Sequence, residues 1–143
     1  MPTEQEQFWA GDFGNRYTER CSDVALIEAK QALFAQVFLR TGEIGSVIEF
    51  GANRGLNLQA ICQLHPGMHL GAVEINDEAV RHLRLFGADE VFHLSMLDCA
   101  ELTRPYDLAF TMGVLIHIAP DDLPKAYDAL YRSSRRYILL AEY

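Results

Sequence analysis

The sequence predicts a single α/β domain in which five parallel strands form a sheet with helices on both faces. Short apolar segments alternate along the chain with segments whose apolar residues recur about every 3.6 positions. The apolar segments are continuous, as strands covered on both faces require. Because parallel neighbours must be joined by crossovers, this alternation favours parallel pairing with right-handed connections. A length of 143 residues fits one such domain.

Five strands and four long helices are expected along the chain. The expected strands are residues 46–50, 69–75, 90–94, 106–112 and 136–143, and the expected helices are residues 22–40, 56–64, 76–86 and 120–133. Ser22 and Asn76 are predicted N-caps, Gly42 is a stop signal, and Pro120 suits the first turn of a helix. Residues 1–21 are rich in glycine and aromatic side chains, and we expect them to be irregular.

Composition and charge exclude several classes of protein. Twelve basic and twenty acidic residues give a net charge of −8, which is poorly suited to coating nucleic acid or an anionic membrane by bulk charge. The alternative is a local basic patch that binds either one. No apolar run reaches the roughly 18 residues of a spanning helix, and the first residues lack a signal-peptide layout. The odd number of widely spaced cysteines favours a reduced, cytoplasmic protein. We expect no metal site, because Pro66 and Gly67 keep His65 and His69 from sharing a helical face.

The segment from Glu49 to Gly55 is the first candidate ligand-binding element. It leaves a predicted strand and enters a predicted helix, so its backbone N–H groups should face the carboxyl edge of the sheet, where open α/β folds bind ligands. Gly51 and Gly55 allow a tight turn, and Asn53 tolerates a left-handed conformation. The alternative is a plain strand-to-helix turn.

Two acidic positions are expected further along the same edge. Glu74 follows the second strand, where its carboxylate can accept hydrogen bonds from both hydroxyls of a ribose. After the third strand, Met96 or Leu97 can pack on a flat base while Asp98 accepts from an exocyclic amine. The alternatives are a solvated or helix-starting acid for Glu74 and an ordinary turn residue for Asp98.

The fourth segment, residues 111–118, follows the fourth strand. Met112 and the backbone beside it would form the floor between cofactor and acceptor. His117 could take a proton from an acceptor hydroxyl, because an unperturbed imidazole titrates near neutral pH. The alternative is a histidine that bonds to backbone and holds the loop in place.

In order along residues 22–143, these motifs resemble those of class I S-adenosylmethionine-dependent methyltransferases, which have a Rossmann-like core. The resemblance rests on Glu49-x-Gly51-x-x-x-Gly55, Glu74, Asp98, and the strand and loop from Tyr106 to Pro120. It implies S-adenosyl-L-methionine as cofactor, with Glu49 and the Gly51–Gly55 loop at its methionine part, Glu74 at its ribose hydroxyls and Asp98 near its adenine amine. The implied contact residues are Glu49, Gly51, Ala52, Asn53, Gly55, Glu74, Ile75, Met96, Leu97, Asp98, Met112 and Tyr17.

Two further segments, Phe8–Tyr17 and Ile48–Leu58, resemble the pseudaminic acid biosynthesis-associated methylases. Asn53 replaces the middle glycine of the wider family and suits this narrower group. The resemblance implies a small polar acceptor, such as a nonulosonic acid sugar. The aromatic residues of the N-terminal segment, Trp9, Phe13 and Tyr17, are then a candidate lid over the cofactor. The alternative is that they only cover the end of the sheet.

The chain stops inside its fifth predicted strand. Class I enzymes continue into an antiparallel hairpin that helps to shape the acceptor pocket, so the resemblance implies a shortened core without that hairpin. An alternative function is therefore a non-catalytic cofactor-binding domain that forms a homodimer through its exposed fifth strand. A dinucleotide oxidoreductase is a third reading. It is disfavoured because the glycine spacing is G-x-x-x-G, and the dinucleotide fingerprint is G-x-G-x-x-G.

Overall fold

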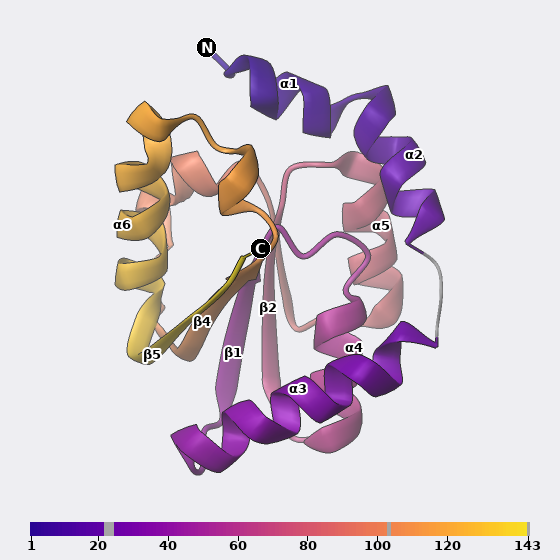
Figure 1. Cartoon of the computed structure of the whole chain (residues 1–143), viewed down its shortest axis with the longest axis vertical. Coiled ribbons are helices and arrows are strands. Elements are labelled where there is room, and N and C mark those ends of the chain that lie inside the picture. The colour runs from indigo at the N-terminus through magenta and orange to yellow at the C-terminus, as the bar shows by residue number, and fades with distance from the viewer. Residues whose placement is uncertain (22–24, 103, 143) are drawn as a thin grey trace.

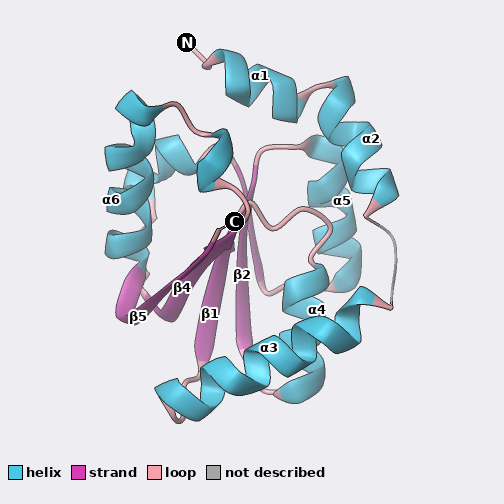
Figure 2. Ribbon diagram, in the orientation of Figure 1, coloured by secondary structure: helices cyan, strands magenta, loops and turns pink. Residues whose placement is uncertain are grey.

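A five-stranded parallel sheet forms the centre of the computed structural model, which describes residues 1–21, 25–102 and 104–142 (Figures 1 and 2). The strand order β3-β2-β1-β4-β5 and the pairing of every neighbour in parallel confirm the predicted fold class. The strands are β1 (Ser46–Phe50), β2 (His69–Glu74), β3 (Glu90–His93), β4 (Tyr106–Met112) and β5 (Ser134–Ala141).

Helices cover both faces of the sheet, as predicted. They are α1 (Glu4–Ala10), α2 (Asp12–Arg20), α3 (Leu26–Thr41), α4 (Leu56–Leu64), α5 (Asp77–Phe86) and α6 (Leu123–Ser133), with 3₁₀ turns at Met96–Glu101, Leu115–His117 and Pro120–Asp122. Asn76 caps α5 by accepting the N–H of Ala79 at 3.0 Å, as expected. The proposed cap Ser22 lies outside the described residues.

Alternating side chains of β1 divide the interior into two cores. Val47 packs with Phe34 of α3 and Leu58 of α4 on one face. Ile48 packs with Leu130 of α6 on the other face. Burial on both faces explains why the strand segments read as continuous apolar runs. No helix among the described residues is long and apolar enough to cross a bilayer.

The N-terminal segment is helical, which corrects the prediction that residues 1–21 are irregular. Thr3 and Glu6 form a reciprocal capping box at the start of α1, and this feature supplies the helix start that its composition concealed. Gly11 separates α1 from α2. The ring of Trp9 lies 5.3 Å from those of both Phe13 and Tyr17, so aromatic packing joins the two short helices.

Other boundaries differ from the expectations by a few residues, and two of these differences have a local cause. β5 begins at Ser134, two residues before the predicted start, because α6 leads into it without a loop. Pro120 opens a 3₁₀ turn, and the α-helix begins only at Leu123.

A close approach between α2 and α5 fixes the N-terminal helices over the carboxyl edge of the sheet (Figure 1). The side-chain amide of Asn76 donates to the carbonyl of Trp9 at 3.2 Å and to Oδ1 of Asn15 at 2.8 Å. A Cβ on Gly14 would lie 2.8 Å from that amide nitrogen, so glycine allows the contact. The cap of α5 is therefore also the attachment point of α1 and α2.

Candidate functional site

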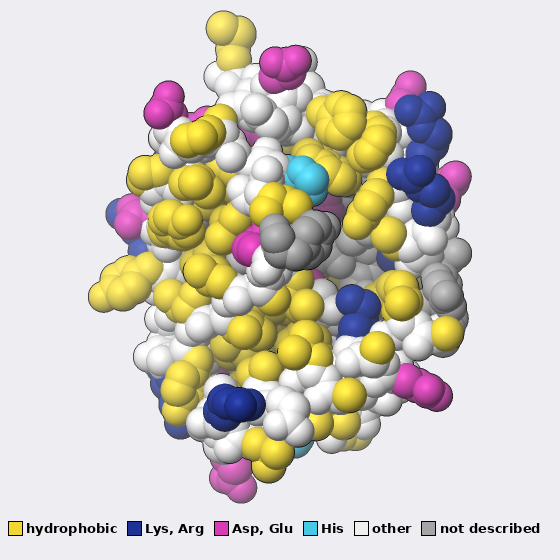
Figure 3. All heavy atoms as spheres, viewed as in Figure 1, with side chains coloured by type: hydrophobic (Ala, Val, Ile, Leu, Met, Phe, Trp, Pro, Cys, Tyr) yellow, Lys and Arg dark blue, Asp and Glu magenta, His cyan; other side chains and the backbone are white. Residues whose placement is uncertain are grey.

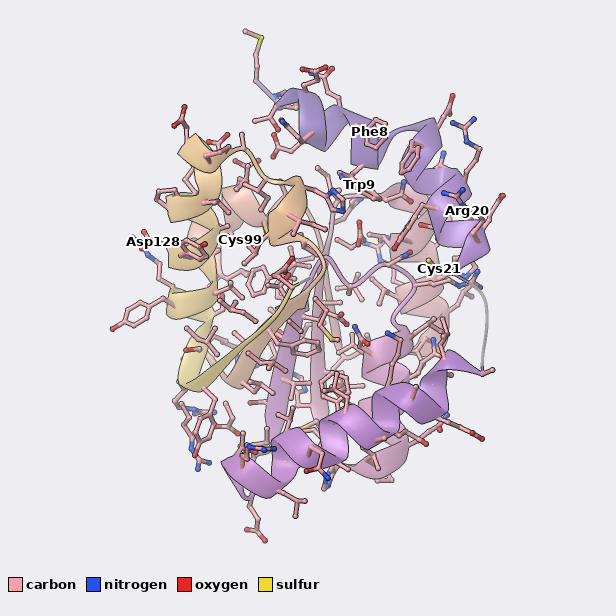
Figure 4. The ribbon with its side chains drawn as sticks, in the orientation of Figure 1. Phe8, Trp9, Arg20, Cys21, Cys99 and Asp128 are labelled. Carbon is pink, nitrogen blue, oxygen red and sulfur yellow. The ribbon has the colours of Figure 1, made fainter. Side chains whose placement is uncertain are left out.

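A cavity of about 340 Å³ lies at the carboxyl edge of the sheet, under α1 and α2. Its walls come from the ends of β1, β2 and β4, the loop after β3, and the N-terminal helices. Figure 4 shows Trp9 beneath α1, directed toward this edge. Of the predicted site residues, those that line the cavity are Tyr17, Glu49, Gly51, Ala52, Asn53, Glu74, Ile75, Met96, Leu97, Met112 and His117.

The turn after β1 has the tight geometry expected of it. Gly51 and Gly55 have φ of +73° and +81°, and Asn53 between them has φ of 48°. A Cβ on Gly51 would lie 2.5 Å from Cγ2 of Val114, so a larger residue would also clash with the loop after β4. Gly55 is the N-cap of α4 and lies outside the cavity lining. Oδ1 of Asn53 is buried without a hydrogen-bond partner in the structure.

Glu49 is a carboxyl group buried at the end of β1. Its Oε1 accepts a hydrogen bond from the amide of Asn57, while its Oε2 is buried and has no partner. Burial raises its pKa to about 8, and the bond from Asn57 and the charge of Lys30 oppose that rise. A cationic group in the cavity would satisfy the free oxygen and favour the charged form.

Glu74 is a second buried carboxyl group, at the end of β2. Its Oε2 accepts the N–H of Asn53 at 2.7 Å, and its Oε1 accepts the N–H groups of Ile75 and Asn76, both at 2.8 Å. Burial raises its pKa, and the three backbone donors oppose that rise. Because a carboxylate offers about four acceptor sites, Oε2 can still accept a hydroxyl of a ligand.

The loop after β3 brings only part of its predicted set to the cavity. Met96 and Leu97 line it, whereas Asp98 is exposed and lies outside the lining, so its contact with the cofactor stays a prediction. The physical reason is the 3₁₀ turn that begins at Met96. Ser95 starts this turn by accepting the N–H of Leu97, and its carbonyl accepts the N–H of Asp98. Ser95 itself lines the cavity.

His117 lies at the far end of the loop after β4. Its exposed ring packs 4.7 Å from the ring of Trp9, so it meets the N-terminal helices. The loop is held by another residue, because the carboxylate of Glu142 accepts the N–H groups of Val114 and Leu115 at 3.2 and 3.3 Å. The role of binding the loop backbone, the alternative considered for His117, is therefore performed by Glu142.

Two residues of the cavity, Asn57 and Lys30, were not predicted from the sequence. Asn57 stands one turn inside α4 and contacts Glu49, and its position after the glycine turn was the one available signal. Lys30 on α3 donates to Oδ1 of Asn57 at 2.7 Å across 27 positions of sequence. Such a long-range contact leaves no pattern in a local stretch of residues.

The raised pKa of Glu49 predicts a pH dependence of stability. Below pH 4.5 this carboxyl group is protonated in both the folded and the unfolded chain. Between about 4.5 and 8 the unfolded chain loses the proton while the folded chain keeps it. The free energy of unfolding therefore falls as the pH rises through this interval. Urea denaturation at several pH values should show that Glu49→Gln removes this decline. A wild-type slope that the variant retains would contradict the assignment.

Solved structures of methyltransferases share this fold. The sugar N-methyltransferase KedS8 from Streptoalloteichus sp. ATCC 53650 superposes with a TM-score of 0.71, at 19% identity, over 94% of this chain and 54% of its own. DesVI from Streptomyces venezuelae gives 0.69, at 17% identity, over 92% and 56%. The chain has the class I methyltransferase fold.

The glycopeptide N-methyltransferase MtfA, crystallised with sinefungin, superposes at a TM-score of 0.66 and 16% identity, over 78% of this chain and 53% of that one. The chain thus spans little more than half the length of these structures. No protein-family model matches the sequence, and no curated protein matches it either.

Proposed function

We propose that this chain binds S-adenosyl-L-methionine in the cavity at the carboxyl edge and takes part in methyl transfer to a small polar molecule. The observation that carries the proposal is the pair of buried carboxyl groups, Glu49 and Glu74, on either side of the left-handed turn at Gly51–Gly55. Burying carboxyl groups costs free energy unless they are hydrogen-bonded, and Oε2 of Glu49 still lacks a partner that a ligand can supply.

The residues present fit this cofactor. The free Oε2 of Glu49 suits the ammonium group of the methionine part, and Oε2 of Glu74 suits a ribose hydroxyl. Gly51 has no side chain, so its backbone can come close to the ligand. The side chains proposed to pack on the adenine are Ile75, Met96 and Leu97, which line the cavity beside Glu74.

The chemistry asks mainly for positioning. When bound, S-adenosyl-L-methionine supplies a methyl group that its sulfonium has already activated. Met112 and the backbone of Gly113 would align the acceptor at the floor of the cavity, and alignment of reacting groups can supply roughly 7–11 kcal/mol. Trp9 and Tyr17 would cover the site and exclude water as parts of a lid. His117, packed on Trp9, is the proposed proton acceptor for the substrate.

A sugar of the nonulosonic (pseudaminic) acid pathway is the proposed acceptor class, on the resemblance of residues 8–17 and 48–58 to methylases of that pathway. A structural neighbour that acts as a sugar N-methyltransferase supports an acceptor of sugar type.

A cytoplasmic location and a homodimer complete the proposal. The three cysteines are free, which suits a reducing compartment. β5 lies at one end of the sheet, where Ile138 and Leu140 are 43% and 48% exposed. Figure 3 shows hydrophobic side chains gathered over the face formed by α6 and β5. Light scattering should report a dimer at micromolar concentration, and Ile138→Lys should give a monomer. A wild-type monomer would refute this part.

The function is tested by isothermal titration calorimetry with S-adenosylhomocysteine and with NAD as the control ligand. We expect micromolar binding of the first and none of the second. Binding of neither, or of NAD alone, would overturn the methyltransferase reading. Transfer of a radiolabelled methyl group to an amino sugar or nonulosonic acid then separates an active enzyme from a non-catalytic cofactor-binding domain.

A further inference from the structure

Three polar side chains from separate elements form a line along one wall of the cavity. Lys30 of α3 donates from Nζ to Oδ1 of Asn57 at 2.7 Å, and the amide nitrogen of Asn57 donates to Oε1 of Glu49. All three residues line the cavity. A single amide group therefore separates an ammonium from a buried carboxyl group.

The two ends of this line have unused hydrogen-bonding groups of opposite kinds, an acceptor on Glu49 and donors on Lys30. Glu49 is 1% exposed and keeps Oε2 without a partner, while Lys30 is half-buried and uses one of its three donors on Asn57. An α-amino acid carries its ammonium and its carboxylate on one carbon atom. The cavity wall thus offers one acceptor and one positively charged donor, the two kinds of group that bind such a zwitterion.

We propose that Lys30 binds the carboxylate of an α-amino-acid group whose ammonium is bound by Glu49, with Asn57 holding the two receptor groups apart. The inference rests on the proposed function, in which that amino acid is the methionine part of the cofactor. It assigns a ligand-binding residue to α3, a helix that carries none of the sequence motifs described above.

The start of α4 favours the same placement of negative charge. This helix begins after Gly55, and no side chain caps its first N–H groups. Leu56 and Asn57, in its first turn, line the cavity. Uncapped N–H groups at a helix N-terminus attract anions, so the backbone of α4 and Lys30 would act on one carboxylate together. The opposing effect of Lys30 on the pKa of Glu49 agrees with their closeness.

The experiment compares ligands that differ only in the amino-acid end. Calorimetry measures the affinity of the wild type and of Lys30→Met for S-adenosylhomocysteine and for its decarboxylated analogue, which keeps the ammonium. We expect Lys30→Met to weaken S-adenosylhomocysteine about 10- to 100-fold, the range of a lost charge-assisted bond, and to leave the analogue within about twofold.

Two further variants serve as controls. Lys30→Arg keeps the positive charge and should recover most of the affinity for S-adenosylhomocysteine. Arg40→Met removes a positive charge at the other end of α3, outside the cavity lining, and should change neither affinity.

An equal loss of affinity for both ligands in Lys30→Met would show that the lysine only orients Asn57. Unchanged affinity for both would show that the lysine contacts neither ligand. Either result overturns the inference while leaving the proposed function standing. If the wild type binds neither ligand, the proposed function itself fails.

Discussion

Replacing Glu74 with alanine should weaken the binding of S-adenosylhomocysteine by at least about a hundredfold. In our proposal this carboxylate accepts hydrogen bonds from both ribose hydroxyls, and charge-assisted bonds contribute roughly 1.5–3 kcal/mol each. The residue is 8% exposed and lies in the cavity wall. In the variant, water can therefore replace its hydrogen bonds to the ribose only in part. Calorimetric titration of the purified variant measures the effect directly.

The same substitution also removes the acceptor of three backbone N–H groups, so stability needs a separate measurement. Thermal unfolding of the variant shows whether a folded protein is being titrated. Glu28→Ala is the matched control, since Glu28 is exposed on α3 outside the cavity lining, and its affinity should equal that of the wild type. A folded Glu74→Ala protein with wild-type affinity would refute the assignment of the ribose contact.

The substitution Gly14→Ala should detach the N-terminal helices from the cavity. A Cβ at this position would lie 1.8 Å from the backbone carbonyl oxygen of Trp9, a clash that side-chain rotation cannot relieve. Overpacking of this kind typically costs 1–3 kcal/mol, and here it also breaks the bonds from Asn76 to Trp9 and Asn15. We expect about a tenfold loss of affinity for S-adenosylhomocysteine, because the proposed lid no longer covers the ligand.

Trp9 is the single tryptophan, so fluorescence reports on this region alone. Its emission should shift to longer wavelength in Gly14→Ala as the ring leaves Phe13, Tyr17 and His117 for water. Gly67→Ala is the control, since a Cβ there meets nothing within 4 Å. If Gly14→Ala kept both the emission and the affinity of the wild type, α1 and α2 would not be packed as described.

The sheet and its order of elements were accessible from the sequence because each strand carries its own signal. The mostly apolar segments 46–50 and 106–112 gave the observed bounds of β1 and β4, and Asn76 marked the start of α5. Burial on both faces and the needs of a helix end are properties of a few neighbouring residues, which a short stretch of sequence contains. The glycine turn was readable for the same reason, since its positive φ angles require particular residue types.

The N-terminal helices were missed because their glycines and aromatic residues outweighed a local capping box. Gly14 is helical and serves a contact with Asn76, 62 positions away, which no nearby residue announces. The exposure of Asp98 could not be predicted for a related reason. The position after the third strand was correct, but the 3₁₀ turn begun by Ser95 decides which side chains of that loop reach the cavity.

The sequence by itself determined the parallel sheet, the left-handed turn at Gly51–Gly55, and the two carboxyl groups at the edge of the sheet. These depend on backbone preferences and on apolar patterns that act within a few residues. Only the tertiary structure decided that Asn76 holds the N-terminal helices, that Asp98 faces solvent, and that Lys30 reaches Glu49 through Asn57. These contacts join helices, strands and loops that are distant in the chain, so they exist only once packing of the two cores has fixed where each element lies.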